Sequence, residues 1–304
     1  MGNTSGVTEP ELSGTIPNTN PGPVFVNPIT HEAVAVFLAS TLTTNAGDPP
    51  FGKEPHLWDF VASAQPAGGA PPTNVVNHAI FKGVIDSPTT APAGTTTYGS
   101  LLAGIFPSAD ADSAGNIYAV WGTLSARPDA TIGPDPATTW DIWFASSHDG
   151  GKTFYGPFKI SSGVGTSVFP WIAAGDAGKV DIVWYQANNP APPLLSDPTT
   201  PAQLTGGPNQ MPPGTVWNVM FAQSFNANSR EPSFTVVQAG DNPNHRGNIS
   251  IGGATGSSDR SLADYFNVFV GPDGVANICI PITPTLPGAK RRISRSPAKR
   301  RTHR

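Results

Sequence analysis

The sequence has almost no cysteine and little charge. Its 304 residues include one cysteine, Cys279, and charged residues make up 12% of the chain. A single cysteine excludes an intramolecular disulfide and a cysteine-cluster metal site. No apolar run approaches the ~20 residues of a membrane helix, and the first residues, MGNTSGVTEPELSG, lack the basic and apolar regions of a signal peptide. We expect a soluble chain without a membrane span, with any export signal removed or not included.

Glycine and proline, in contrast, are abundant. The chain contains 33 glycines and 34 prolines, and its Val, Ile, Phe and Trp residues recur in short bursts. This composition is typical of short strands joined by many turns. The sequence therefore favours an all-β fold.

Basic residues are concentrated at the C-terminal end. Residues 290–304 hold eight of the 17 lysines and arginines and no acidic residue, whereas residues 1–289 carry 9 basic and 21 acidic residues. The tail, KRRISRSPAKRRTHR, has no aromatic residue and no helical period. We expect residues 283–304 to form a disordered basic tail rather than a specific nucleic-acid-binding arm.

Four segments of the chain share one pattern. They are PVFVNPITHEAVAVF (23–37), PSADADSAGNIYAVW (107–121), PWIAAGDAGKVDIVW (170–184) and FNVFVGPDGVANICI (266–280). Each has a short strand, a turn of small or polar residues and a second strand that alternates apolar and polar residues. Period-two alternation predicts strands, and the short turn makes each segment a hairpin.

A second pattern follows three of the four segments. WDFVASAQ, WDIWFASS and WNVMFAQS begin at Trp58, Trp140 and Trp217, and each leads into one more strand. Four strands per unit predict the blades of a β-propeller, because an immunoglobulin-like sandwich would not repeat a Trp-Asp strand three times. We expect an N-terminal extension at 1–21 and about three and a half four-stranded antiparallel blades at 22–282. Either residues 1–21 and partner chains help to close the ring, or the chain is part of a longer, six-bladed protein.

The stretch SHDGGKTF carries a resemblance to a known family. Ser147, Asp149, Gly151, Thr153 and Phe154 match the Asp-box, or BNR, pattern Ser/Thr-x-Asp-x-Gly-x-Thr-Trp/Phe. The chain thus resembles the sialidase-like, Asp-box β-propellers. The resemblance implies a structural turn between the third and fourth strands of a blade, on the face away from the active site. Ser224-Phe225-Asn226 looks like a degenerate copy of the turn.

Strand direction then indicates the other face of the blades for function. The turns between strands one and two and between strands three and four share one face, whereas the longest connections share the other. Three arginines fall in those connections: Arg127, Arg246 and Arg260. Guanidinium groups suit a substrate carboxylate, although local salt bridges with acidic residues of the same loops are the alternative.

The resemblance implies an extracellular glycan or glycoprotein as partner, with exo-sialidase hydrolysis as the activity if the chain is an enzyme. Tyr265 with Glu54, and Asp264, are the candidates for nucleophile and acid/base; Asp129 and Asp259 could also serve. The alternative class is a non-catalytic propeller that serves as a scaffold or protein-binding module. We expect a secreted or cell-surface protein that needs no cofactor.

No metal site is expected from the sequence. Asp110-Ala-Asp112-Ser-Ala-Gly115-Asn116 has the start of a calcium loop but lacks the terminal glutamate, so a plain turn is favoured. The tryptophans at 121, 143, 171 and 184 are expected in the blade core. Trp58, Trp140 and Trp217 could lie in the core or stack on a sugar.

Overall fold

The computed structural model describes residues 19–40, 57–65, 77–84, 107–124, 140–190, 195–196, 204–205, 211–247, 249 and 267–280. Within these ranges the chain is all-β, with antiparallel strands and no helix. The all-β prediction is therefore confirmed for these residues. None of them forms a helix long and apolar enough to cross a membrane. The expected extension at 1–21 lies mostly, and the tail at 283–304 entirely, outside them.

Two four-stranded sheets come first in the chain. Sheet 1 has the strand order β1 (Thr19–Val26), β2 (Ala33–Ser40), β3 (Leu57–Gln65) and β4 (Asn77–Val84). Sheet 2 has the order β5 (Ser108–Ala111), β6 (Ile117–Leu124), β7 (Trp140–Ser147) and β8 (Tyr155–Lys159). In both sheets each strand pairs antiparallel with the next strand along the chain.

Sheet 3 repeats this strand order completely, whereas sheet 4 has only its first two strands within the described residues. Sheet 3 runs β9 (Ser167–Ala174), β10 (Val180–Ala187), β13 (Val216–Ser224) and β14 (Thr235–Gln238), and β15 (His245–Arg246) also pairs with β13. Sheet 4 is the hairpin of β16 (Asn267–Val270) and β17 (Ala276–Cys279). A separate two-stranded pair joins β11 (Leu195–Ser196) to β12 (Leu204–Thr205). The repeat predicted the strands of sheets 1 to 4 but missed β11, β12 and β15.

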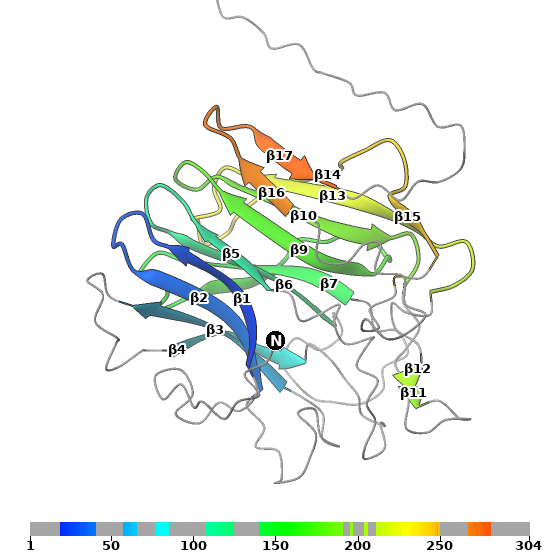
Figure 1. Cartoon of the computed structure of the whole chain (residues 1–304), viewed down its shortest axis with the longest axis horizontal. Helices are drawn as coiled ribbons and strands as arrows, with labels where there is room; N and C mark the ends of the chain where they lie inside the picture. The colour runs from blue at the N-terminus through cyan, green and yellow to red at the C-terminus, as the bar shows by residue number, and fades with distance from the viewer. Residues whose placement is uncertain are drawn as a thin grey trace, which may run out of the picture.

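The four sheets follow one another in chain order. Their first strands are in contact in succession, β1 with β5, β5 with β9 and β9 with β16. In Figure 1 the series runs from the blue strands of sheet 1 to the orange hairpin of sheet 4. A strand inside this series is covered on both faces, which is why β10 is buried along nearly all of its length.

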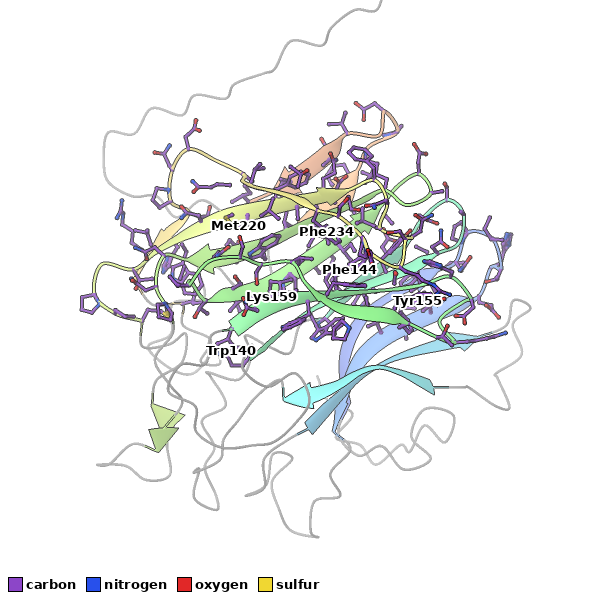
Figure 2. The ribbon with its side chains drawn as sticks, turned by 180° about the vertical axis from the view of Figure 1, so that it is seen from behind. Trp140, Phe144, Tyr155, Lys159, Met220 and Phe234 are labelled. Atoms are coloured by element: carbon purple, nitrogen blue, oxygen red, sulfur yellow. The ribbon has the colours of Figure 1, made fainter. Side chains whose placement is uncertain are left out.

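Apolar side chains fill the spaces between consecutive sheets. One cluster includes Val36 and Ile117 from sheets 1 and 2, and Val183 and Val268 from sheets 3 and 4. A second cluster brings residues of sheet 2 against sheet 3; its members include Tyr118, Val120, Phe144, Ile172, Ile182 and Trp184. Phe144 and Phe234, labelled in Figure 2, meet edge to face with ring centroids 5.0 Å apart.

The turn between the first two strands has the same backbone pattern in every sheet. A backbone N–H at its start donates to the carbonyl just before the second strand, as from Asp112 to Asn116, 3.0 Å. The same bond joins Asn27 to Glu32, Gly175 to Lys179 and Gly271 to Val275. A residue with positive φ follows in each turn: His31, Gly115, Gly178 and Gly274. The four turns are therefore equivalent positions of one repeat.

The tryptophans divide between core and surface. Trp121, Trp140, Trp184 and Trp217 are buried, and Trp143 packs against the core. The expectation that Trp171 is a core residue is wrong, because 38% of it is exposed. Alternation along β9 puts Trp171 on the face toward sheet 4, like Ala173. Sheet 4 is a narrow two-stranded hairpin, so it leaves part of the Trp171 indole ring exposed.

Candidate functional site

The turn between β7 and β8 is closed by the side chains of the SHDGGKTF stretch. The hydroxyl of Ser147 donates to Asp149 Oδ1, 2.8 Å, and accepts from the N–H of Gly151, 2.9 Å. The backbone N–H of Thr153 donates to Asp149 Oδ1, 2.8 Å, and its hydroxyl to Oδ2, 2.6 Å. Gly150 and Gly151 both have positive φ, which glycine adopts without a steric penalty.

These bonds favour the ionised form of Asp149. Burial opposes its ionisation, but hydrogen bonds from Thr153 and Ser147 outweigh burial and hold the pKa of the carboxyl below its ordinary value. A carboxylate whose two oxygens both accept bonds inside its own turn has a structural task. The geometry fits the structural turn that the resemblance implies.

The turn between β13 and β14 repeats the arrangement with an amide. Ser224 Oγ donates to Asn226 Oδ1, 3.1 Å, and accepts from the N–H of Asn226, 3.2 Å. Ser233 then donates to Asn226 Oδ1 from its backbone and its hydroxyl, both 2.9 Å. Ser233 therefore does the work of Thr153 from three residues further along the chain. The two turns therefore share one arrangement of side-chain acceptors.

These two turns and the four β-hairpin turns of the repeat lie at the same end of the sheets. We call it the short-turn end; it consists of residues 27–32, 112–116, 148–154, 175–179, 225–234 and 271–275. We call the other end, where β2 leads to β3, β6 to β7 and β10 to β13, the long-connection end. Figure 2 shows the separation along sheet 2, with Tyr155 at the short-turn end and Trp140 and Lys159 at the other.

At the long-connection end of sheet 2, polar side chains bond to one another. The Lys159 ammonium lies 2.7 Å from Asp141 Oδ2, and the hydroxyl of Ser161 donates to Asp141 Oδ1, 2.6 Å. The Ser161 oxygen also accepts from the N–H of Ile142, 3.0 Å. Asp141 is buried and Lys159 is partly exposed. This cluster joins the ends of β7 and β8, so its residues are already occupied structurally.

At the same end of sheet 3, one arginine faces solvent. Arg246 is exposed on β15, where it pairs with Val216 at the start of β13. The neighbouring Trp217 is buried, and its indole Nε1 donates to the carbonyl of Gly247, 2.9 Å. The N–H of Gly247 donates to the carbonyl of Thr215, 2.9 Å. Arg246 therefore lies on a short strand that is held against β13 by its pairing and by the bonds of Gly247.

Only part of the glycan site predicted from the sequence falls within the described residues. Of the three arginines, Arg246 alone falls in the described residues; Arg127 and Arg260 lie outside them. Tyr265, Glu54 and Asp264, and also Asp129 and Asp259, lie outside as well. Burial of Trp140 and Trp217 makes these two rings core residues rather than platforms for a sugar; Trp58 has no described side chain.

The calcium-like segment at 110–116 is a turn bonded by protein donors. Asp112 is buried, and its carboxylate accepts from the backbone of Ala114, Asn116 and Gly178, from the Asn116 amide and from the Tyr118 hydroxyl, at 2.6 to 3.2 Å. Burial opposes ionisation of Asp112, but the bonds from Tyr118, Asn116 and Gly178 hold its pKa below the ordinary value. The described residues contain no group of three or more potential metal ligands.

The sequence reasoning missed a chain of polar contacts from sheet to sheet. Asn27 Nδ2 donates to the carbonyl of Gly115, 2.9 Å, and Gly178 donates to Asp112 Oδ2, 2.8 Å. Lys179 Nζ donates to the carbonyl of Gly274 and lies 3.8 Å from Asp181 Oδ2. The sequence carries no clear signal for these contacts, because each of them joins a side chain to a backbone group of another turn.

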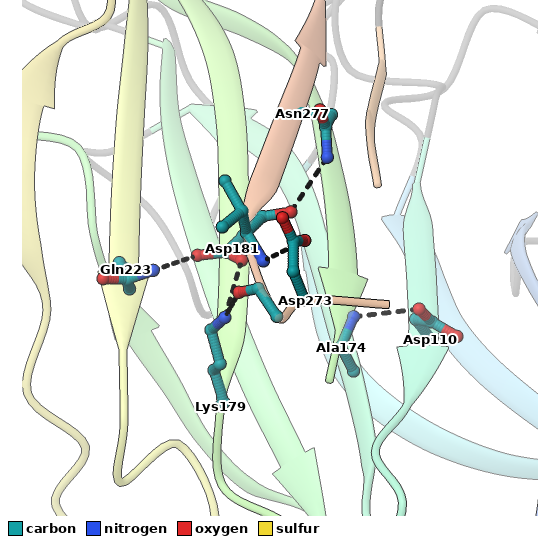
Figure 3. A network of polar contacts seen from close by, with 9 residues as sticks. Asp110, Ala174, Lys179, Asp181, Gln223, Asp273 and Asn277 are labelled. Atoms are coloured by element: carbon teal, nitrogen blue, oxygen red, sulfur yellow. Dashed lines mark hydrogen bonds and ion pairs between the residues drawn. The ribbon is translucent and has the colours of Figure 1, made fainter. Parts of the chain in front are cut away.

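Figure 3 shows the part of this network around Lys179. Gln223 Nε2 donates to Asp181 Oδ1, 2.6 Å, and the N–H of Ala174 donates to Asp110 Oδ2, 2.9 Å. Burial raises the pKa of both carboxyl groups, of Asp110 and of Asp181. These acids tie neighbouring strands and sheets together at the short-turn end.

Comparisons with known proteins give no family and no function. No protein-family model and no curated protein matches the sequence. A structure of a protein of unknown function from Dyadobacter fermentans DSM 18053 is 14% identical, with a TM-score of 0.33 over 86% of this chain and 79% of that one. A β-fructofuranosidase from Microbacterium saccharophilum K-1 is 10% identical, with a TM-score of 0.28 over 87% of this chain and 64% of that one. Scores this low carry no information on what this chain does.

Proposed function

We propose that the chain is an Asp-box β-propeller of the sialidase-like type that recognises an extracellular, carboxylate-bearing glycan at its long-connection end. Two four-stranded sheets, one five-stranded sheet and a hairpin, in contact through their first strands, support the propeller. The bonds of Ser147, Asp149 and Thr153 support the Asp-box turn. In this proposal, the protein works at the cell surface or outside the cell.

The observation that carries the glycan proposal is Arg246. Its side chain is exposed at the end of the sheets opposite the Asp-box turns, on a strand held by Trp217 and Thr215. A guanidinium presents several N–H donors in one plane and binds a carboxylate in two places at once. A sialic acid carries such a carboxylate, whereas neutral sugars do not.

Binding is tested with sialylated glycans and the same glycans after removal of sialic acid. We expect the full chain to bind the sialylated set, and Arg246→Ala to weaken binding at least about tenfold, since a hydrogen-bonded charge contributes roughly 1.5–3 kcal/mol. Arg230→Ala is the matched control, because Arg230 is exposed at the short-turn end, with its guanidinium 5.5 Å from the Tyr155 ring centroid. Equal binding by wild type and Arg246→Ala would contradict the proposal.

An activity assay on the same protein tests whether the chain also hydrolyses the glycan. In the sialidase-like proposal, Arg127 and Arg260 share the carboxylate with Arg246, and Tyr265, Glu54 and Asp264 supply the chemistry. Release of the fluorophore from a fluorogenic sialoside, lost in Tyr265→Phe, would extend the proposal to exo-sialidase activity. Binding without turnover leaves a glycan-binding module, and the absence of both favours a scaffold without a glycan ligand.

A further inference from the structure

The two ends of the sheet series expose several residues, among them Val24 and Cys279, at positions that are buried in the other sheets. Each sheet has a back, toward the preceding sheet, and a front, toward the following one. Ile172 on the back of sheet 3 and Val120 on the front of sheet 2, for example, lie in the core cluster between them. The back of sheet 1 and the front of sheet 4 have no neighbouring sheet among the described residues.

The back of sheet 1 exposes two valines. Val24 stands three residues before the turn residue Asn27, and it is 69% exposed. The residues at the same position in the other sheets are Ala109, Ile172 and Val268, which are 6%, 2% and 2% exposed. Val26, on the same face, is also exposed. Sheet 1 therefore presents the apolar back of a repeat without the sheet that would cover it.

The front of sheet 4 exposes the complementary positions. Cys279, the fourth residue of the second strand, is exposed. The fourth residues of the second strands in the other sheets are Val36, Val120 and Val183, and all three are fully buried. Asn277 is exposed where Tyr118 and Asp181 are fully buried.

The register also places Phe269, 55% exposed, opposite Asn277 on the same face. Phe269 occupies in sheet 4 the position that Asp110 occupies in sheet 2. Asp110 accepts a hydrogen bond from Ala174 of sheet 3, so this position faces the following sheet. Sheet 4 therefore presents the front of a repeat.

We propose that copies of this chain associate front to back, with sheet 4 of one copy packed on sheet 1 of the next. A second copy carries the surface that each end lacks, because its sheet 1 has the free back and its sheet 4 the free front. Val24 and Phe269 are both exposed within one copy, so the two ends do not cover each other. A heterologous contact of this kind can close into a ring of copies.

The turns at the two ends carry polar side chains that can pair. At the contact between sheets 1 and 2, the side chain of Ile29 lies against Gly115 of the next turn. The position of Ile29 is held in sheet 4 by Asp273, and the position of Gly115 is held in sheet 1 by His31; both are exposed. In the front-to-back contact the acid of one copy therefore lies against the histidine of the next.

The association is tested by sedimentation of the full chain. We expect wild type to form dimers or larger assemblies of the 31.5 kDa chain. Val24→Asp and Phe269→Asp should each weaken self-association at least about tenfold, since they place a charge in a buried apolar contact. The control is Val237→Asp, at an exposed valine on the outer strand β14, which should associate as wild type does.

Mixing the two variants identifies the geometry. A Val24→Asp copy keeps a normal front and a Phe269→Asp copy keeps a normal back, so the mixture should form a dimer although each variant alone is monomeric. All three positions are exposed in the single chain, and unchanged circular dichroism will show that the variants fold.

A wild-type monomer at ~100 µM would overturn the proposal, as ~100 µM is the Kd of a weak association of about 5.5 kcal/mol. Assemblies that persist in either variant would overturn it too.

Discussion

A few short polar side chains determine the geometry of the turns in this protein. Ser147 and Asp149 close the β7–β8 turn by accepting hydrogen bonds from Gly151 and Thr153, and Ser224 and Asn226 close the β13–β14 turn in the same way, with Ser233 as a donor. Serine, aspartate and asparagine suit this task because their side chains reach backbone groups two to four residues away. The resulting hairpins need no ligand to hold them.

The first prediction concerns the carboxylate of Asp149. Asp149→Ala removes the acceptor of both Thr153 donors, and we expect a loss of about 1–2 kcal/mol in the free energy of unfolding. Because its folded pKa is lowered, the carboxylate stabilises the protein above pH ~4 and stops doing so as the pH falls through the folded pKa. Urea denaturation of wild type and Asp149→Ala at pH 7 and pH 3 measures the loss in the free energy of unfolding, which should be smaller at pH 3. Lys152→Ala, in the same turn, is the control, and an equal difference at both pH values would contradict the prediction.

The second prediction concerns Asp112, which bonds its own turn and the next sheet. Asp112→Ala leaves the donors of Gly178 and Tyr118 without their acceptor in a buried place, so we expect a loss of about 3 kcal/mol. Asp176→Ala, at an exposed acid of the following turn, should change the free energy of unfolding by less than about 0.5 kcal/mol. Equal losses in urea denaturation would show that Asp112 is not the bridge between sheets.

Single residues were predictable where a motif marks them. The offsets of Ser147, Asp149 and Thr153 predicted the turn, and Asp112 lies in a turn, as expected. The bridging role of Asn27 and Lys179 was not predictable, since their partners are backbone carbonyls of another sheet, 88 and 95 residues away. Trp171 was misjudged because its exposure depends on the width of sheet 4.

At the scale of elements, the turn glycines connect neighbouring sheets. Gly115 has φ +82°, and a Cβ there would meet the side chains of Asn27 at 2.9 Å and Ile29 at 3.1 Å. Gly214 has a similar φ, +83°, but a Cβ there would meet nothing within 4 Å. The two glycines therefore share the backbone conformation and differ only in their surroundings.

The third prediction uses this difference. Gly214→Ala should cost about 1 kcal/mol, the penalty of a left-handed backbone for a residue with a Cβ. Gly115→Ala should cost at least about 1 kcal/mol more, because the added methyl also pushes against sheet 1. Thermal and urea unfolding of both variants compare the two losses. Equal losses in the two variants would mean that sheet 1 accommodates the added methyl group at position 115 without a loss of stability.

Strands were the most predictable elements of this fold. Alternation along Ile117–Leu124 and Val180–Ala187, and the Trp-led third strands, predicted the sheets in chain order. The two-residue strands β11, β12 and β15 were missed because two residues are too few to show a period. Within β15 lies Arg246, so the missed element carries a predicted binding residue.

At the scale of the whole molecule, the two ends of the sheets differ in how their polar side chains are engaged. The short-turn end is occupied by bonds that hold hairpins and sheets together, among them those of Asp112, Asp149 and Lys179. The long-connection end carries the exposed Arg246 on a fixed strand. Propeller closure and the glycan remain predictions at this scale, since they depend on side chains outside the described residues and on a partner or ligand.

Amide hydrogen exchange of the full chain, with and without a sialylated glycan at saturating concentration, tests glycan recognition at the long-connection end. We predict slower exchange in residues 211–217 and 239–247, around Arg246, and unchanged exchange in residues 147–154 and 224–234. Protection confined to the two Ser-led turns, or no protection anywhere, would contradict the proposal that this chain recognises a glycan at its long-connection end.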